Sequence, residues 1–418
     1  MLSKLLQRWV LLFFIVSYFP YGLDYYIPLL APIFKPYFAL VDSASIGLVH
    51  ALGLAKGKVI VQDTGSGDAL LSYVIRFFFV CVSFPLAACW VLSRPHASAS
   101  QALYNCGFFI LRFTLGAILL SYGFGKLIPI QFASPSLYSL MQPLVLHSPM
   151  GLVWVFMGLS PAYTMFTGLA VVVAGICLFF NRTALVGAML SLAVMVNVFM
   201  LNMCYDVPVK LSSFEYMVMS IALIMMHRKG LFTFLFSINP ASQNALMHPT
   251  VSKRQSIFGH LATVILLAYL FYFNIGESWG YYQDEEKSKA SNKLSGIYNV
   301  DYFMVNSDTI PPLLTDKRRW RRLIIDKWDQ NVVQMMDDKF AGFDRKYDAI
   351  APKMTMTNEK DTSLNVCFAY TKADPNRLVL HGKQRSDSLH IALHRMPDSL
   401  MVLTSRGFHW VSELPFNR

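Results

Sequence analysis

Long apolar runs fill the first two thirds of the chain, and short runs that alternate with polar residues fill the last third. A helix needs about 20 apolar residues to cross a bilayer, so the long runs predict membrane-spanning helices. The short runs are rich in β-branched and aromatic residues and predict strands. Seven segments are assigned as spans: 9–30, 70–92, 104–128, 162–180, 183–203, 212–226 and 256–275.

The apolar segment 150–159 lies between two Ser-Pro steps and is too short to span a bilayer. It predicts an interfacial or a re-entrant helix, and both alternatives stay open. Without it as a span, eight Lys and Arg residues lie on the side of the N-terminus and five on the other side; counting it as a span gives four and nine. The positive-inside rule therefore favours seven spans, with the N-terminus inside and the C-terminal domain outside.

A polar linker at 277–293 separates the last span from the strand-rich region 294–418. Eight short strands joined by turns predict a small barrel or a sandwich. The strands are expected near 296–305, 320–326, 331–337, 347–356, 364–371, 377–384, 388–395 and 400–411. The rest divides into two N-terminal spans with an outer loop (1–103), a four-helix membrane core (104–226), and a cytoplasmic loop with the seventh span (227–276).

Composition agrees with this division. Only 15% of the residues are charged and 55% are hydrophobic, which excludes a soluble enzyme, a disordered chain and a fibrous protein. Residues 1–276 hold 15 Lys and Arg and 6 Asp and Glu, against 21 and 19 in residues 277–418. The net charge of +11 therefore comes mostly from basic residues that orient the membrane region. We expect the lipid bilayer but no nucleic acid as a partner. The basic run 317–322 fits lipid head groups or a solvated strand.

Two cations and two glycines share one face of the third span. Arg112, Gly116, Gly123 and Lys126 follow one another at helical spacing. A charge inside a span costs about 2.5–3.5 kcal/mol on insertion scales, so it usually faces a cavity or a partner. Both cations also lie near the ends of the span, where they can extend into the interface while the glycines let helices pack closely. Both interpretations stay open.

A second polar cluster lies where the fifth span ends and the sixth begins. Pro208 is expected to end the fifth span and to leave a short turn. The cluster is either a ligand pocket beside Lys126 or a salt-bridge network that fixes the helix hairpin, and pairing of Lys126 with Asp206 or Glu215 fits both. We expect Asp68 to cap the second span. The candidate site residues are Arg112, Lys126, Asn202, Tyr205, Asp206, Lys210 and Glu215.

These residues together resemble the DoxX-like family of small membrane proteins. The matching motifs are Arg112-Phe-Thr-Leu-Gly, then Tyr-Gly-Phe-Gly-Lys126, and Asn202-Met-Cys-Tyr-Asp-Val-Pro-Val-Lys210. The resemblance covers about residues 104–226. It implies a four-helix bundle in the bacterial cytoplasmic (inner) membrane, with a quinone as candidate cofactor and a membrane redox protein as candidate partner. The two N-terminal spans, the seventh span and the outer domain depart from the minimal family and put a simple subunit role in doubt.

The outer domain resembles lipocalin-type barrels in Leu294-Ser-Gly-Ile-Tyr at its start and Arg406-Gly-Phe-His-Trp at its end. This resemblance implies an apolar ligand inside the barrel; a core filled by side chains is the alternative. His381, His390 and His394 fall on neighbouring predicted strands. We expect surface histidines there and no metal site.

No residue set has the spacing of a known catalytic constellation, so the sequence does not decide whether the chain is an enzyme. Two functions remain as hypotheses. The first is support of a quinone-linked membrane redox process, as a subunit of a membrane oxidoreductase. The second is a non-enzymatic membrane-anchored binding or assembly module whose outer β domain captures a lipid or a protein partner.

Overall fold

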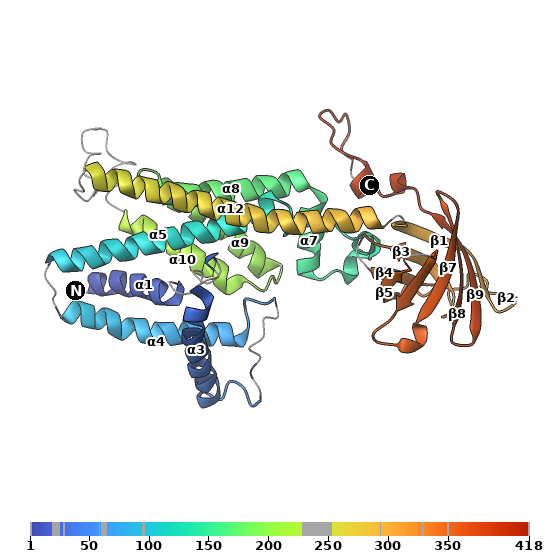
Figure 1. Cartoon of the computed structure of the whole chain (residues 1–418), viewed down its shortest axis with the longest axis horizontal. Helices are drawn as coiled ribbons and strands as arrows, with labels where there is room; N and C mark the ends of the chain where they lie inside the picture. The colour runs from blue at the N-terminus through green and yellow to red at the C-terminus, as the bar shows by residue number, and fades with distance from the viewer. Residues whose placement is uncertain are drawn as a thin grey trace. The chain divides into compact units, whose positions relative to one another are not determined.

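The computed structural model describes residues 2–18, 26–27, 30–57, 59, 65–93, 97–227, 253–292, 294–327, 330–348 and 351–416. The chain divides into two compact units (Figure 1). The helical unit consists of Met1–Gln131 and Ala162–Gly280. The β unit consists of Phe132–Pro161 and Tyr281–Arg418, so it includes a segment inserted between two helices of the first unit.

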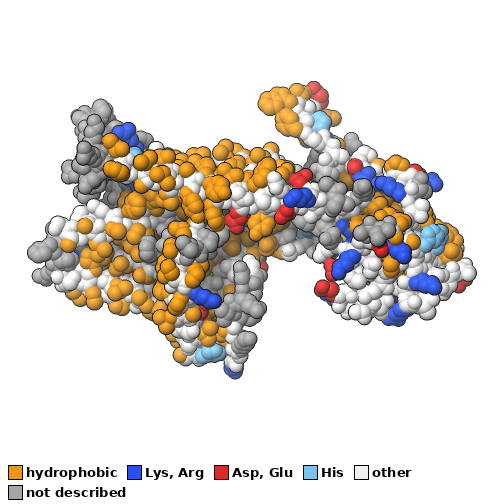
Figure 2. Space-filling view, viewed as in Figure 1, with side chains coloured by type: hydrophobic (Ala, Val, Ile, Leu, Met, Phe, Trp, Pro, Cys, Tyr) orange, Lys and Arg blue, Asp and Glu red, His pale blue; other side chains and the backbone are white. Residues whose placement is uncertain are grey.

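Eight long helices make up the described part of the helical unit. They are α1 (Leu2–Tyr18), α3 (Ala31–Ala51), α4 (Leu70–Leu92), α5 (Ala97–Leu127), α8 (Pro161–Phe179), α9 (Ala184–Cys204), α10 (Lys210–Met226) and α12 (Lys253–Ser291). Five of the helices that the structure describes are long and apolar enough to cross a membrane, by length and composition: α4, α5, α8, α9 and α12. Hydrophobic side chains cover most of the visible face of this unit (Figure 2). The chain is therefore a multi-pass membrane protein with a helical membrane region and a β domain after it.

The other two predicted spans correspond to α1 and α10, which are helical but only 17 residues long each. Residues 19–25 and 28–29 of the predicted first span lie outside the described residues. Helix α3 occupies a segment that was predicted as outer loop. Pro32, Lys35, Pro36 and Asp42 interrupt its apolar residues, which is why hydropathy alone does not reveal it.

Glycines bring α5 and α8 into backbone contact. A Cβ atom added at Gly168 would lie 2.6 Å from the Leu127 amide nitrogen and 2.8 Å from the Gly123 carbonyl oxygen. A Cβ atom added at Gly123 would lie 2.5 Å from a methyl carbon of Val172. The predicted packing role of the α5 glycines is therefore confirmed, because any side chain there would push the two helices apart.

The β unit contains a closed barrel, which confirms the predicted fold class. Its strands are β1 (Gly296–Val305), β3 (Trp320–Ile325), β4 (Gln330–Met335), β5 (Phe340–Tyr347), β6 (Lys353–Thr357), β7 (Val366–Asp374), β8 (Arg377–Gln384) and β9 (Asp387–Arg395). Each strand pairs antiparallel with the next, and β9 returns to β1 with Tyr298 opposite Arg395 and Val305 opposite Leu389. The two-residue strand β2 (Asp308–Thr309) forms a hairpin with β1.

Alternating apolar residues of these strands point inward and fill the barrel. Leu323, Val333, Phe368, Leu380 and Ile391 are completely buried in one cluster. Filled packing of this kind is the alternative that the sequence left open to a ligand-bearing interior. A ligand of the β unit is therefore expected outside the barrel core.

Two predicted strands are wrong. The single strand expected at 347–356 is the end of β5 followed by a separate β6. No strand occupies 400–411; this segment instead contains the short helical pieces η5 (Asp398–Leu400) and α13 (Val402–Ser405). Because the barrel already closes through β9 and β1, it offers no free edge to a further strand.

Short elements also lie in the inserted segment and between β6 and β7, where η4 spans Thr362–Leu364. The segment holds α6 (Leu137–Met141), η2 (Leu144–Leu146) and α7 (Pro149–Leu159), so the predicted short helix at 150–159 is present. Helix α7 packs closely against the start of the segment at Gly158, because a Cβ atom added there would lie 2.3 Å from the Ala133 carbonyl oxygen. The predicted polar linker at 277–293 is helical through Ser291, as the last part of α12.

Candidate functional site

The Lys126 side chain is buried near the C-terminal end of α5. The residue is only 6% exposed. Its ammonium lies 5.2 Å from the centre of the Tyr122 ring, one helical turn earlier. Among the described residues it makes no ion pair or hydrogen bond, and the expected pairing with Asp206 or Glu215 is absent because both carboxylates bind other cations. A cationic side chain that is buried without an acidic partner loses hydration energy that no ion pair offsets.

Glu215 of α10 instead forms a buried cluster with α1 and α4. Arg76 Nε donates to Glu215 Oε1 at 2.7 Å, and the Tyr18 hydroxyl donates to the other carboxylate oxygen. The Arg76 guanidinium also lies over the Tyr18 ring, 5.0 Å from its centre. Since Glu215 is 5% exposed, this cluster compensates a carboxylate that would otherwise be costly inside the bundle.

A row of tyrosine rings connects Lys126 with this cluster. The Tyr122 and Tyr216 ring centres are 5.8 Å apart, and those of Tyr216 and Tyr18 are 6.3 Å apart. The structure therefore brings Lys126 and Glu215 to the two ends of one row of rings rather than into an ion pair. The sequence analysis missed these tyrosines, although the four-residue spacing of Tyr122 and Lys126 places both on one helix face.

The hairpin between α9 and α10 forms a separate network around Lys210. Its ammonium lies 2.8 Å from Asp206 Oδ1 and 3.6 Å from Asp68 Oδ2. Asp68 accepts the backbone N–H groups of Lys210 and Leu211, each at 2.9 Å, and thereby caps α10. The expectation that Asp68 caps the second span is wrong: Ala69 is the N-cap of α4, and the loop before it packs on the hairpin.

Three further candidates have structural positions. Asn202 is buried and donates to Ser213 Oγ at 3.0 Å, which joins α9 to α10. Tyr205 is the C-cap residue that follows α9 and is 40% exposed. Arg112 is buried among phenylalanine rings and donates to Asn181. It lies 14 residues from Lys126, about 21 Å along α5, so the two cations do not share a site.

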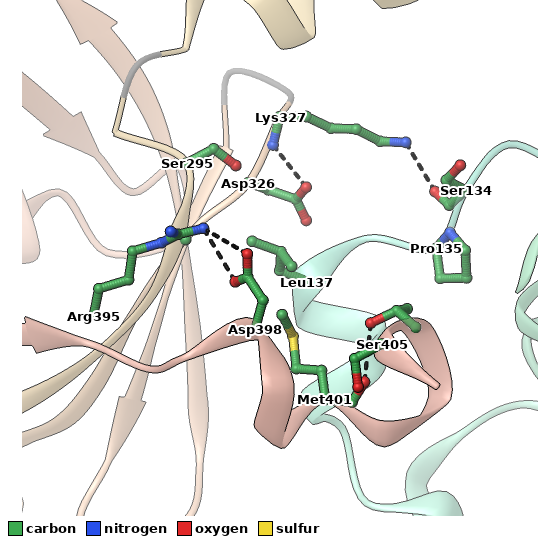
Figure 3. Close-up of a pocket in the computed structure, with 12 residues that line it drawn as sticks. Ser134, Pro135, Leu137, Ser295, Asp326, Lys327, Arg395, Asp398, Met401 and Ser405 are labelled. Carbon is green, nitrogen blue, oxygen red and sulfur yellow. Dashed lines mark hydrogen bonds and ion pairs between the residues drawn. The ribbon is translucent and has the colours of Figure 1, made fainter. Parts of the chain in front are cut away.

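The β unit contains a pocket of about 460 Å³ (Figure 3). Its walls come from the inserted segment (134–137), the barrel (295–296, 326–327 and 395) and the chain after β9 (398–405). The lining includes charged groups of both signs and several hydroxyls, with a few apolar side chains. Sequence analysis missed this pocket because its walls are distant in sequence and carry no motif.

A buried carboxylate opens into the pocket. Asp326 is 6% exposed and accepts the Lys327 backbone N–H at 2.7 Å. The carboxylate forms no ion pair among the residues that the structure describes, whereas the Asp326 backbone carbonyl oxygen accepts from Arg345 Nη1 at 3.3 Å. Lys327 turns instead toward Glu285 Oε1 at 2.8 Å and the Ser134 carbonyl oxygen at 2.9 Å.

The opposite charge in the pocket belongs to Arg395. Its Nη2 atom donates to Asp398 Oδ1 at 3.1 Å, as drawn in Figure 3. Both side chains are partly exposed, at 35% and 64%. Gly296 lines the same wall, and a Cβ atom there would lie 2.8 Å from Arg395 Nε. The glycine therefore lets the guanidinium group lie against the barrel rim.

The histidines lie on the outside of the barrel. The Nδ1 atoms of His381 and His390, on paired strands, are 2.8 Å apart, and His394 Nδ1 is 2.6 Å from Asp301. Burial and the neighbouring His381 ring lower the pKa of His390. No group of three or more His, Cys, Asp or Glu side chains in the described ranges could hold a metal ion.

Comparison with known proteins gives one informative similarity. No protein-family model matches the chain, and no solved structure matches it. The chain is similar to the uncharacterized protein YwoB of Bacillus subtilis (strain 168), with 33% identity over 94 residues. These residues make up 22% of this chain and 60% of that relative.

Proposed function

We propose that this chain is a multi-pass protein of the bacterial cytoplasmic membrane that binds a quinone in its helical unit and supports a quinone-linked redox process. The observation that carries the proposal is the Lys126 side chain, since the residue is 6% exposed and its ammonium lies beside the Tyr122 ring with no acidic partner among the described residues. The resemblance of residues 104–226 to DoxX-like proteins agrees with it, and the similar YwoB protein is bacterial.

A quinone head group fits the chemistry of this position. Its carbonyl oxygens accept hydrogen bonds, and its flat ring can stack against an aromatic side chain. Its hydrocarbon tail dissolves in the bilayer, where the helices of this unit lie. Lys126 would hold and orient one carbonyl oxygen, and Tyr122 would contact the ring. When bound, the quinone would supply the electron and proton transfer.

The test is the quinone content of the purified full-length protein. Ubiquinone and menaquinone are extracted from protein in mild detergent and quantified by mass spectrometry. Lys126→Met should lower the content at least about tenfold, because a hydrogen bond to a charged group contributes about 1.5–3 kcal/mol. Lys210→Met is the matched control, since that ammonium already pairs with Asp206 and Asp68. Quinol-dependent oxygen uptake by membranes carrying each variant tests the redox role.

Equal quinone contents in the two variants would disprove the assignment to Lys126. A wild-type protein with no more quinone than an unrelated membrane protein purified in the same way would disprove quinone binding altogether.

A second candidate function is a non-enzymatic binding module whose β unit captures a lipid. The observation that favours it is the charged pocket beside the barrel, since the barrel core itself is filled by side chains. In this case the helical unit anchors the module in the membrane, and the β domain lies on the outer side as the positive-inside rule predicts.

A further inference from the structure

We propose that the pocket of the β unit binds a head group that combines a phosphate with a primary ammonium, as phosphatidylethanolamine does. The inference goes beyond quinone binding and rests on the second candidate function, for which it names the ligand class. It follows from three features of the pocket: an unpaired buried carboxylate, a partly exposed guanidinium group and adjoining apolar side chains.

The Asp326 carboxylate is the ammonium end of the site. The residue is only 6% exposed, yet it lines a pocket, and its carboxylate forms no ion pair with a described residue. The buried Arg345 guanidinium group donates to the Asp326 backbone carbonyl oxygen instead. Leaving a carboxylate desolvated and unpaired is costly. A primary ammonium offers three donors and one positive charge, which compensate this carboxylate better than a neutral ligand would.

Arg395 is the phosphate end of the site. Its guanidinium group is one-third exposed and pairs with Asp398, which is more exposed still. A guanidinium group has five N–H donors, so Arg395 can bind a phosphate oxygen while it keeps Asp398. Gly296 leaves room for this side chain at the rim, as the close Cβ position shows. The ammonium of Lys327 is already paired with Glu285, so it stabilises the pocket wall and is not assigned a ligand contact.

The charge pattern separates this ligand from simpler ones. An inorganic anion would meet the carboxylates of Asp326 and Asp398, and a lone cation would meet Arg395. A zwitterion with its charges a few bonds apart avoids both repulsions. The volume of about 460 Å³ accommodates a head group with its glycerol but not two acyl chains, which would remain outside.

Apolar side chains in the pocket wall, and after it in the sequence, suit the acyl part of a lipid. Met401 lines the pocket, and Leu403, Phe408 and Trp410 follow it with exposures of 70%, 82% and 88%. Trp, Phe and Leu are typical of the apolar surfaces that lie in the membrane interface.

The test measures head-group selectivity of the full-length protein in mild detergent by native mass spectrometry. The probes are phosphatidylethanolamine, phosphatidylglycerol, N-acetylated phosphatidylethanolamine and soluble glycerophosphoethanolamine. We expect one phosphatidylethanolamine per chain, retained at least tenfold more strongly than the two lipids without an ammonium. Asp326→Asn should abolish this preference. Asp337→Asn, a carboxylate paired with Lys339 in the β4–β5 hairpin, is the matched control and should keep it.

The soluble probe identifies the source of the ligand. If glycerophosphoethanolamine binds as strongly as the lipid, the site takes the head group from solution; if only the lipid binds, the site takes it from a membrane. Both outcomes support the proposal. Equal retention of all three lipids by the wild type would overturn it, and so would an unchanged preference in folded Asp326→Asn.

The lipid comparison on the wild type decides the question even if Asp326→Asn does not fold. Quinone content is measured on the same samples. A negative lipid result therefore leaves the quinone proposal standing, and a negative quinone result leaves the head-group site standing.

Discussion

Lys126 and Lys210 are the same residue type near the ends of neighbouring helices, and their surroundings give them different roles. Lys210 lies 2.8 Å from one carboxylate and 3.6 Å from another, so its charge is compensated within the protein. Lys126 is more deeply buried and has an aromatic ring as its nearest described partner. An uncompensated buried charge points to a ligand more strongly than a paired one does.

The His381–His390 pair predicts an acid-dependent loss of stability. Burial and the neighbouring His381 lower the pKa of His390 in the folded protein. The unfolded chain therefore takes up a proton more readily as the pH falls below about 6.5, and stability decreases from there down to the lower native pKa. His390→Gln removes this proton uptake. Its melting temperature, measured in detergent by intrinsic fluorescence, should fall less than that of the wild type between pH 7.5 and 5.

His409→Gln is the control for this experiment, because His409 is exposed in the segment after α13. This variant should follow the wild-type pH profile. If His390→Gln also followed it, the pair would not influence stability in this pH range.

At the scale of elements, the contact between α5 and α8 makes a sharp prediction. A methyl group at Gly168 would meet the backbone of α5 at 2.6 Å, whereas one at Gly125 has nothing within 4 Å. Gly168→Ala should therefore destabilise the protein by about 1–3 kcal/mol through overpacking. Gly125→Ala should be neutral or slightly stabilising, since alanine favours helices. Thermal unfolding of the two variants in the same detergent compares them, and equal melting temperatures would contradict the contact.

The same scale shows what the sequence can reveal about this fold. Long apolar runs indicate helices because bilayer thickness sets their length, and that rule identifies α4, α5, α8, α9 and α12. Strand patterns are less reliable where an inward position is polar. In β5, Arg345 is buried and donates to Asn331, so the alternation that marks a strand is broken there. The apolar residues at 400–411 imitate a strand, but barrel closure excludes one.

The candidate sites were harder to predict than the elements. Arg76 and Glu215 pair although they are 139 residues apart in the sequence, and no sequence pattern indicates that they lie together. The pocket is assembled from the inserted segment, the β3–β4 turn and the end of β9. Periodicity reports which face of an element is buried, but it does not report which distant element lies against that face.

At the scale of the whole molecule, the inserted segment gives the β unit extra chain connections to the helical unit. The chain leaves a candidate span at Leu127, contributes residues 132–161 to the β unit and returns at α8. The β unit is thus connected to the helical unit at three points along the chain: before the segment, after it and through α12. Such a β domain is an integral part of the protein and not a simple C-terminal attachment.

Within the β unit, Lys327 links the inserted segment to the barrel and to the end of α12. Its ammonium joins the β3–β4 turn to Glu285 of α12 and to the Ser134 carbonyl of the inserted segment, and the two charged side chains are only 12% and 8% exposed. Lys327→Met should reduce stability by about 1.5–3 kcal/mol for each charged hydrogen bond lost. It should also expose residues 132–161 to limited proteolysis.

Arg377→Gln serves as the comparison, because it breaks an ion pair with Asp374 whose side chains are 73% and 48% exposed. A surface pair of this kind contributes about 0–1 kcal/mol, so this variant should unfold and digest like the wild type. If Lys327→Met behaved like Arg377→Gln, the inserted segment would be held by the packing of α6 and α7 alone. A selective increase in cleavage at 132–161 would show instead that one buried ammonium fixes the segment that walls the pocket.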